Sequence, residues 1–139
     1  MLNTILIDAG PIIALFDKDD TYHKAVMTFM KGKGFKFITT MPVITEVSHM
    51  LDFSIEAQLA FLEWIMKEGV IIHDVKQGDI SRIVELVQKY KDLPMDFAYA
   101  TLVVAAEQTG IKYIVSIDSD FDIYRLPGKV KIDNIFSKA

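Results

Sequence analysis

Four acidic residues stand beside apolar segments at points where a metal-binding site could form: Asp8, Glu46, Asp96 and Asp118. Asp8 and Asp118 each follow an apolar run typical of a buried strand, whereas Glu46 and Asp96 lie early in segments with helical spacing. Because helices that follow strands in an α/β fold begin at the carboxyl edge of the sheet, we expect all four carboxylates to face one crevice. Four carboxylates together repel one another unless cations neutralise them. Ligands made only of oxygen favour Mg²⁺ or Mn²⁺.

Such a cluster suits phosphodiester hydrolysis, since a bound divalent ion generates hydroxide from water and stabilises the leaving oxygen. Each acid also has a purely structural interpretation. Asp8 and Asp96 would act as helix caps, and Asp118 as a turn residue. A structural role for each acid does not explain why all four should point to the same crevice.

The elements that would position these acids alternate along the chain as strands and helices. Apolar segments predict strands over 5–7, 35–40, 70–75, 112–117 and 129–132, the last as an edge strand. Helices are expected over 11–16, 21–30, 42–51, 55–68, 80–90 and 95–109, with Ser54 and Asp79 as N-caps of the fourth and fifth. This alternation predicts an α/β sandwich with a mostly parallel sheet. The glycine motifs G-x-G-x-x-G and G-x-x-x-x-G-K-[ST] are absent, which argues against nucleotide binding of those kinds.

The composition is that of one globular domain spanning residues 1–139, with 51% hydrophobic and 24% charged residues. Without cysteine, the chain forms neither disulfides nor thiolate zinc sites. No apolar run approaches the roughly 20 residues of a membrane helix, and Asp8 interrupts any N-terminal signal region, so we expect a cytoplasmic protein with no membrane partner. The net charge of −4 argues against indiscriminate nucleic-acid binding but not against a nuclease whose acids gather in one site.

Several short motifs, in order and nearly from end to end, give the chain a resemblance to the PIN domain family, which includes the VapC-like toxins of toxin–antitoxin pairs. They are IDAGP at 7–11, AL at 14–15, YH at 22–23, TEV at 45–47, LPMDFA at 93–98, ATLV at 100–103, SIDSDF at 116–121 and YR at 124–125. The resemblance implies a Rossmann-like three-layer α/β/α sandwich and a Mg²⁺- or Mn²⁺-dependent endoribonuclease. It assigns Asp8, Glu46 and Asp118 to the acidic site, with Ser116 in support. It further implies an RNA substrate, a homodimer and inhibition by a small antitoxin protein.

The chain departs from the family pattern at Tyr99, where relatives with this helix usually carry a third acidic residue of the metal site. Asp96 lies three residues earlier on the same helix face, and we predict that it supplies the missing carboxylate. Asp8, Asp96 and Asp118 would then hold the metal, and Glu46 would complete the site and orient water. The alternative is that Tyr99 closes the site and leaves a module that binds RNA or protein without turnover, because a phenol does not replace a carboxylate as a Mg²⁺ ligand at neutral pH.

Two further interpretations stay open at this point. Asp120 is either a fifth acid of the site or a residue that orders its loop. The apolar residues between 53 and 66 occupy more than one helix face, which indicates core packing together with a surface for a dimer or an antitoxin. A phosphatase with Asp8 as nucleophile is a weaker alternative, because enzymes of that kind place a second acid two residues later, where this chain has Gly10.

Overall fold

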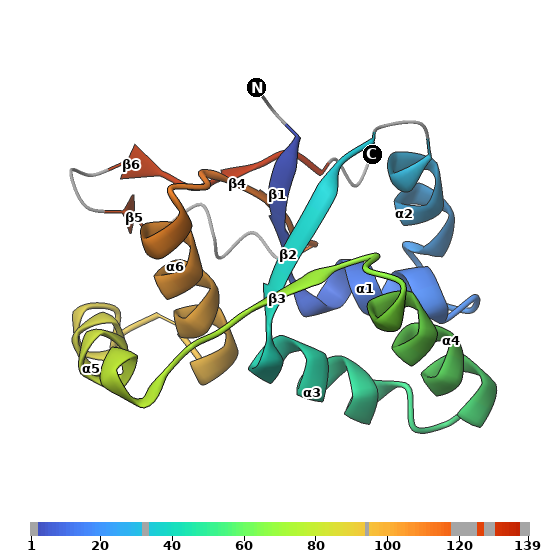
Figure 1. Ribbon diagram of the computed structural model, residues 1–139, viewed down its shortest axis with the longest axis horizontal. Coiled ribbons are helices and arrows are strands. Elements are labelled where there is room, and N and C mark those ends of the chain that lie inside the picture. Colours follow the sequence, from blue (N-terminus) through green and yellow to red (C-terminus); the bar gives the residue numbers. More distant parts are fainter. Residues whose placement is uncertain (1–2, 32–33, 94, 118–124, 127–129, 137–139) are drawn as a thin grey trace.

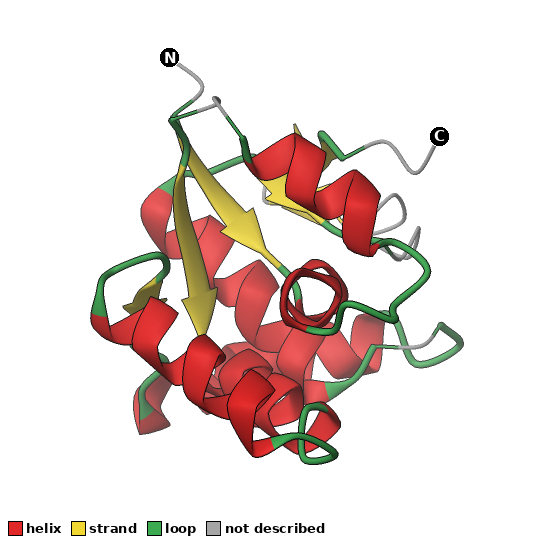
Figure 2. Ribbon diagram, turned by 90° about the vertical axis from the view of Figure 1, so that its right-hand side faces the viewer, coloured by secondary structure: helices red, strands yellow, loops and turns green. Residues whose placement is uncertain are grey.

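The computed structural model describes residues 3–31, 34–93, 95–117, 125–126 and 130–136, with backbone alone for 125, 126 and 130. Its centre is a sheet of five strands in the order β3-β2-β1-β4-β7, and every pairing in this sheet is parallel (Figure 1). The strands are β1 (Thr4–Ile7), β2 (Lys36–Thr40), β3 (Ile71–His73), β4 (Tyr113–Val115) and β7 (Asp133–Asn134). Helices cover both faces, as expected for a three-layer α/β/α sandwich (Figure 2).

Strand β1 is the middle of the sheet, and its apolar residues Ile5, Leu6 and Ile7 are fully buried. Leu6 pairs with Ile38 of β2 on one side and with Ile114 of β4 on the other. A parallel strand covered on both faces needs apolar residues at successive positions, which explains why this run does not alternate with polar residues.

Six α-helices connect and cover the strands in the described part of the chain: α1 (Ala9–Phe16), α2 (His23–Met30), α3 (Met41–Met50), α4 (Ile55–Met66), α5 (Ile80–Lys89) and α6 (Phe97–Thr109). Helices α1, α2 and α4 lie on one side of the sheet, and α5 and α6 lie on the other (Figure 1). Ser54 caps α4 as predicted, because its hydroxyl accepts a hydrogen bond from the Ala57 N–H at 3.2 Å. None of the described helices is long and apolar enough to cross a membrane.

Helix α6 is the most deeply buried helix segment of the described residues. Seven consecutive residues, from Ala100 to Ala106, are buried, so the helix has no solvent face over two turns. It packs on β2 and contacts both α3 and α5. Gly110 ends it with a φ of 76°, a left-handed conformation that glycine adopts at little cost.

One sequence-based expectation is wrong in detail, and another is confirmed in position alone. The C-terminal edge strand of the main sheet is β7, not the predicted strand over 129–132, because β6 (Val130–Lys131) pairs antiparallel with β5 (Arg125–Leu126) in a separate two-stranded sheet. Asp79 is the N-cap residue of α5 as predicted, but its side chain makes no cap bond to that helix. Its carboxylate instead accepts the Lys76 N–H at 2.8 Å, closing the 3₁₀ turn Gln77–Asp79.

Candidate functional site

Asp8 lies directly after β1, at the carboxyl end of the central strand, as its sequence position predicted. It is only 3% exposed, and its backbone N–H donates to the Val115 carbonyl oxygen at 3.0 Å. Its extended backbone also makes it the N-cap of α1, because Oδ1 accepts the Ala9 N–H at 2.7 Å. The structural interpretation of Asp8 as a cap is therefore correct, and it leaves the second carboxylate oxygen to other partners.

Ser116 supplies one of those partners. Its hydroxyl, fully buried at the end of β4, donates to Oδ2 of Asp8 at 3.1 Å. Because both oxygens of Asp8 accept hydrogen bonds from fixed donors, the orientation of this carboxylate is set by the ends of the two neighbouring strands β1 and β4. Ser116 therefore lies beside Asp8, and its supporting role in the site stays a prediction.

Asn134 of β7 positions Ser116, and sequence reasoning did not identify it. Its Nδ2 donates to the Ser116 carbonyl oxygen at 2.9 Å, and its Oδ1 accepts the N–H groups of Ser116 at 3.2 Å and Phe136 at 3.1 Å. The available signal was its place between Ile132 and Phe136, which are both buried. Alternate residues of a strand point to the same face, so Asn134 shares the inward face with these two residues. A polar side chain on an inward face needs hydrogen-bond partners inside the protein.

Glu46 and Asp96 form a second acidic group, on helices α3 and α6, which pack against each other. Partial burial of the Glu46 carboxyl group, and then the negative charge of Asp96, raise the pKa of Glu46 above its ordinary value. Asp96 is the N-cap of α6, since its Oδ1 accepts the Tyr99 N–H at 2.8 Å. Two carboxylates that repel each other in this way attract a cation.

Tyr99 lies in the first turn of α6, and its half-buried side chain packs against the hydrophobic core. The residue therefore contributes to packing at the position where an acid is usual in the family it resembles. Asp96, one turn earlier, supplies a negative charge that raises the pKa of Glu46.

The described residues bring the predicted acids together only in part. Asp118 and Asp120 lie outside them, and among the residues that are described no three His, Asp or Glu side chains are close enough to hold a metal ion. Asp8 with Ser116, and Glu46 with Asp96, are the two groups that this part of the chain forms. The complete cluster of four acids stays a prediction.

Buried hydroxyl groups line the end of β2 beside Asp8. The Thr39 hydroxyl donates to the Ile7 carbonyl oxygen at 2.8 Å, and the Thr40 and Thr101 hydroxyls share a hydrogen bond of 2.7 Å. The second bond ties the start of α3 to α6, the two helices that carry Glu46 and Asp96. The spacing between these acids is therefore held by a buried polar contact.

Comparisons with known proteins agree with this architecture. A family model described as PIN domain matches residues 5–126. Among solved structures, the crystal structure of VapC20 from Mycobacterium tuberculosis, described as a sarcin–ricin loop cleaving toxin, is similar with a TM-score of 0.77 and 19% sequence identity. The similarity covers 86% of this chain and 93% of that one. The search of curated proteins finds no match to the sequence.

Proposed function

The chain belongs to the PIN domain family, and from this premise we propose that it is a divalent-metal-dependent endoribonuclease. The reaction would be hydrolysis of a phosphodiester bond at the carboxyl edge of the sheet. The observation that carries this proposal is Asp8, a buried carboxylate fixed at the end of the central strand by hydrogen bonds from Ala9 and Ser116. A buried charge held in one orientation is costly to maintain and indicates a binding role.

The residues present fit a divalent metal of the Mg²⁺ or Mn²⁺ kind. The donor set consists of carboxylate oxygens, which are the ligands that these hard ions prefer. The Glu46–Asp96 pair adds a second reason, because the negative charge of Asp96 already disfavours ionisation of Glu46 and a cation would relieve that repulsion. We propose Asp8, Asp96 and Asp118 as the metal ligands. When bound, the metal would lower the pKa of water and balance negative charge on the phosphodiester.

The remaining residues have roles that follow from their positions. The Ser116 hydroxyl fixes the orientation of Asp8 by a hydrogen bond, and the Asn134 side chain in turn hydrogen-bonds to the backbone of Ser116. Ser116 is two residues before Asp118 in the chain. Glu46 would orient water, and partial burial together with the negative charge of Asp96 raises its pKa above that of an ordinary glutamate. Asp120 is proposed only as a supporting acid.

An inactive binding module is the weaker alternative. It rests on Tyr99, but the carboxylate of Asp96 lies near Glu46 without any acid at position 99. The packing of Tyr99 against the core also gives this residue a structural reason to be present. The metal-dependent enzyme therefore accounts for more of the observations.

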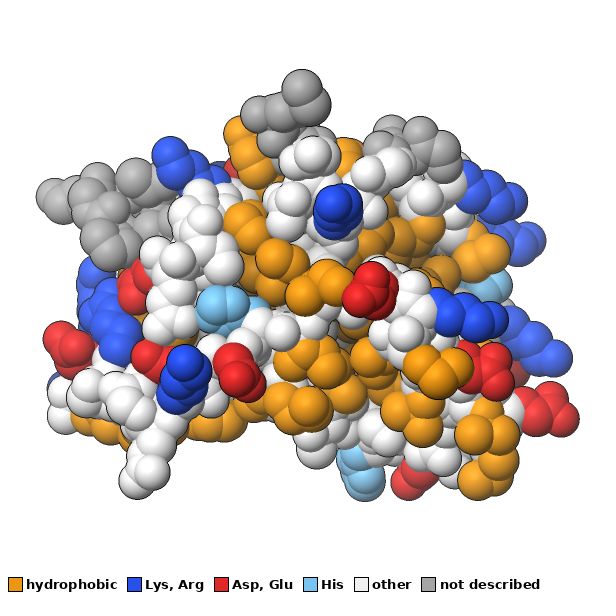
Figure 3. Space-filling view, in the orientation of Figure 1, with side chains coloured by type: hydrophobic (Ala, Val, Ile, Leu, Met, Phe, Trp, Pro, Cys, Tyr) orange, Lys and Arg blue, Asp and Glu red, His pale blue; other side chains and the backbone are white. Residues whose placement is uncertain are grey.

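We also propose that the protein is the toxin of a toxin–antitoxin pair, acting as a homodimer on RNA in the cytoplasm. The similarity in fold to VapC20, a sarcin–ricin loop cleaving toxin by its description, supports this role. Large hydrophobic side chains are exposed around α3 and α4, where Figure 3 shows them gathered at the lower right. They are Met50, Phe53, Ile55, Leu59, Leu62 and Met66. An apolar surface of this kind suits a second copy or an antitoxin.

The test compares the wild-type protein with Asp8→Asn, which keeps one side-chain oxygen as a cap acceptor but removes the charge. We expect Mn²⁺ binding, measured by calorimetry, and RNA cleavage in Mg²⁺ or Mn²⁺ to be lost together while thermal unfolding is nearly unchanged. Asp133→Ala, an exposed acid on β7, is the matched control for loss of one negative charge. Full cleavage by Asp8→Asn would refute the assignment of the site.

A further inference from the structure

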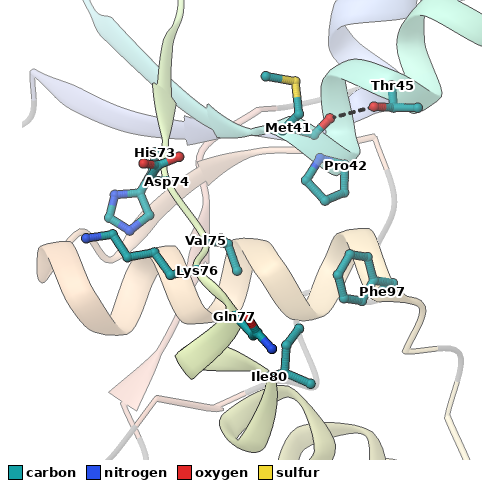
Figure 4. A pocket seen from close by; sticks show the side chains of 10 residues that line it. All are labelled: Met41, Pro42, Thr45, His73, Asp74, Val75, Lys76, Gln77, Ile80 and Phe97. Carbon is teal, nitrogen blue, oxygen red and sulfur yellow. Dashed lines mark hydrogen bonds between the residues drawn. The ribbon is translucent and has the colours of Figure 1, made fainter.

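A cavity of about 520 Å³ opens beside the candidate acids (Figure 4). Three parts of the chain form its walls. Met41 and Pro42 begin α3 directly after β2, a second wall is the segment that follows β3, and the third is Phe97, the first residue of α6. Because the sheet is parallel, the ends of β2 and β3 lie at the same edge as the ends of β1 and β4, which carry Asp8 and Ser116. Open α/β sheets bind their ligands at this edge.

On both α3 and α6, a residue that lines the cavity is the sequence neighbour of a candidate acid. Thr45 lines it and Glu46 is the following residue of α3; Phe97 lines it and Asp96 is the preceding residue of α6. The helices that position the acidic pair thus position one side of the cavity as well. A polymer bound at the acids would continue into this space.

The lining has an apolar end and a polar end (Figure 4). Phe97 is 52% exposed, Met41 53% and Ile80 41%, so three large apolar side chains face solvent in one hollow. His73 and Lys76 lie at the other end. The imidazole Nε2 of His73 is hydrogen-bonded to the Gln108 side chain at 2.7 Å, and Lys76 is the lysine that lines this end of the cavity.

We propose that this cavity binds one unpaired nucleotide of the RNA substrate, with its base against Phe97 and its phosphate beside Lys76. The inference rests on the proposed function and deepens it. An aromatic face and a nearby cation are the two elements by which proteins hold single-stranded nucleic acid. The volume falls within the range of about 300–1,000 Å³ for small-ligand sites, which accommodates one nucleotide and not a duplex. Asp74 also lines the polar end, and its negative charge disfavours a second phosphate there. We therefore assign one phosphate contact to this cavity and not a continuous basic groove.

The experiment measures binding of fluorescently labelled poly(A), poly(U) and poly(C), and of an RNA duplex, to the Asp8→Asn protein, which we expect to bind substrate without cleaving it. Phe97→Ala and Lys76→Ala are added singly to this background. Val84→Ala on α5 and Lys112→Ala beside β4 are matched controls, because both residues are exposed and neither lines the cavity. Thermal unfolding verifies that each variant is folded.

We expect Phe97→Ala to weaken binding of at least one single-stranded RNA about tenfold, within the range for loss of one stacked base, and to leave duplex binding unchanged. Phe97→Trp should preserve binding. Lys76→Ala should weaken binding of all single strands alike and reduce the salt dependence by about one phosphate contact. Neither control should change the affinity.

Two failures are distinguishable. If wild-type protein cleaves RNA but Phe97→Ala binds single strands as tightly as its parent, the nucleotide subsite is refuted and the nuclease stands. If the wild-type protein neither cleaves nor binds any of these RNAs, the proposed function is refuted and the subsite with it. Equal losses from Phe97→Ala and Val84→Ala would also refute the subsite.

Discussion

Asn134 should stabilise the protein far more than a half-buried residue of a two-residue edge strand ordinarily does. Its side chain forms three hydrogen bonds, two with the backbone of Ser116 and one with the N–H of Phe136. Each contributes about 1 kcal/mol net, so Asn134→Ala should lower the free energy of unfolding by about 3 kcal/mol. Against a total of about 5–15 kcal/mol, this loss is large but leaves the protein folded.

The assay is urea denaturation followed by circular dichroism, with Asp133→Ala as the control from the adjacent, exposed position. The control should change the free energy of unfolding by less than about 0.5 kcal/mol, as surface substitutions usually do. Because Asn134 holds Ser116 and Ser116 holds Asp8, we also expect Asn134→Ala to weaken Mn²⁺ binding in calorimetry at temperatures where the variant is fully folded. Equal stability of the two variants would refute the reasoning about the Asn134 hydrogen bonds. Unchanged Mn²⁺ affinity would refute the link from β7 to the site.

The two acids on α3 and α6 give two further predictions. Because the pKa of Glu46 is raised in the folded state, the folded protein binds the Glu46 proton more readily than the unfolded chain does, and the free energy of unfolding should fall as the pH rises from the ordinary glutamate pKa through the raised one. Glu46→Gln should remove this part of the pH dependence of thermal unfolding. An unaltered pH profile in this variant would contradict the raised pKa. Asp96→Asn should keep the N-cap of α6 and lose Mn²⁺ affinity, whereas Asp96→Ala should also lose about 1 kcal/mol of unfolding free energy in urea; tight Mn²⁺ binding by the Asn variant would exclude Asp96 as a ligand.

Much of the fold could be predicted from local patterns. The buried run before Asp8, the Ser54 cap and the glycine after α6 each specify one element through physics that acts over a few residues. Strand β7 was not predicted because Asp133–Asn134 has only two residues, and both are polar. It forms through its pairing with β4, which is not visible in the local sequence. Asp79 is the N-cap residue of α5 as predicted, but the sequence did not show that its side chain bonds to the preceding 3₁₀ turn and not to the helix.

The candidate site was predictable to the extent that it follows from strand ends. Asp8 lies at the end of β1 as its sequence position predicted, whereas Ser116 was named only through the family resemblance, and parallel pairing brings the ends of β1 and β4 together. The role of Asn134 was not predictable, since it depends on a side chain reaching across from an edge strand to the backbone of Ser116. For Asp96 the sequence allowed a cap or a ligand; the structure shows the cap, and the ligand role stays a prediction.

The central position of β1 has a consequence for how the protein is made. Asp8 and its partner Ser116 are 108 residues apart in the chain, and Asn134 follows later still. Contacts of such sequence separation form late, because the loop entropy must be overcome before they contribute. A ribosome must therefore translate the 108 residues that follow Asp8 before the Asp8–Ser116 contact can form. Nascent chains that end before Ser116 lack the hydrogen bond to Oδ2 that helps to fix the orientation of the Asp8 carboxylate.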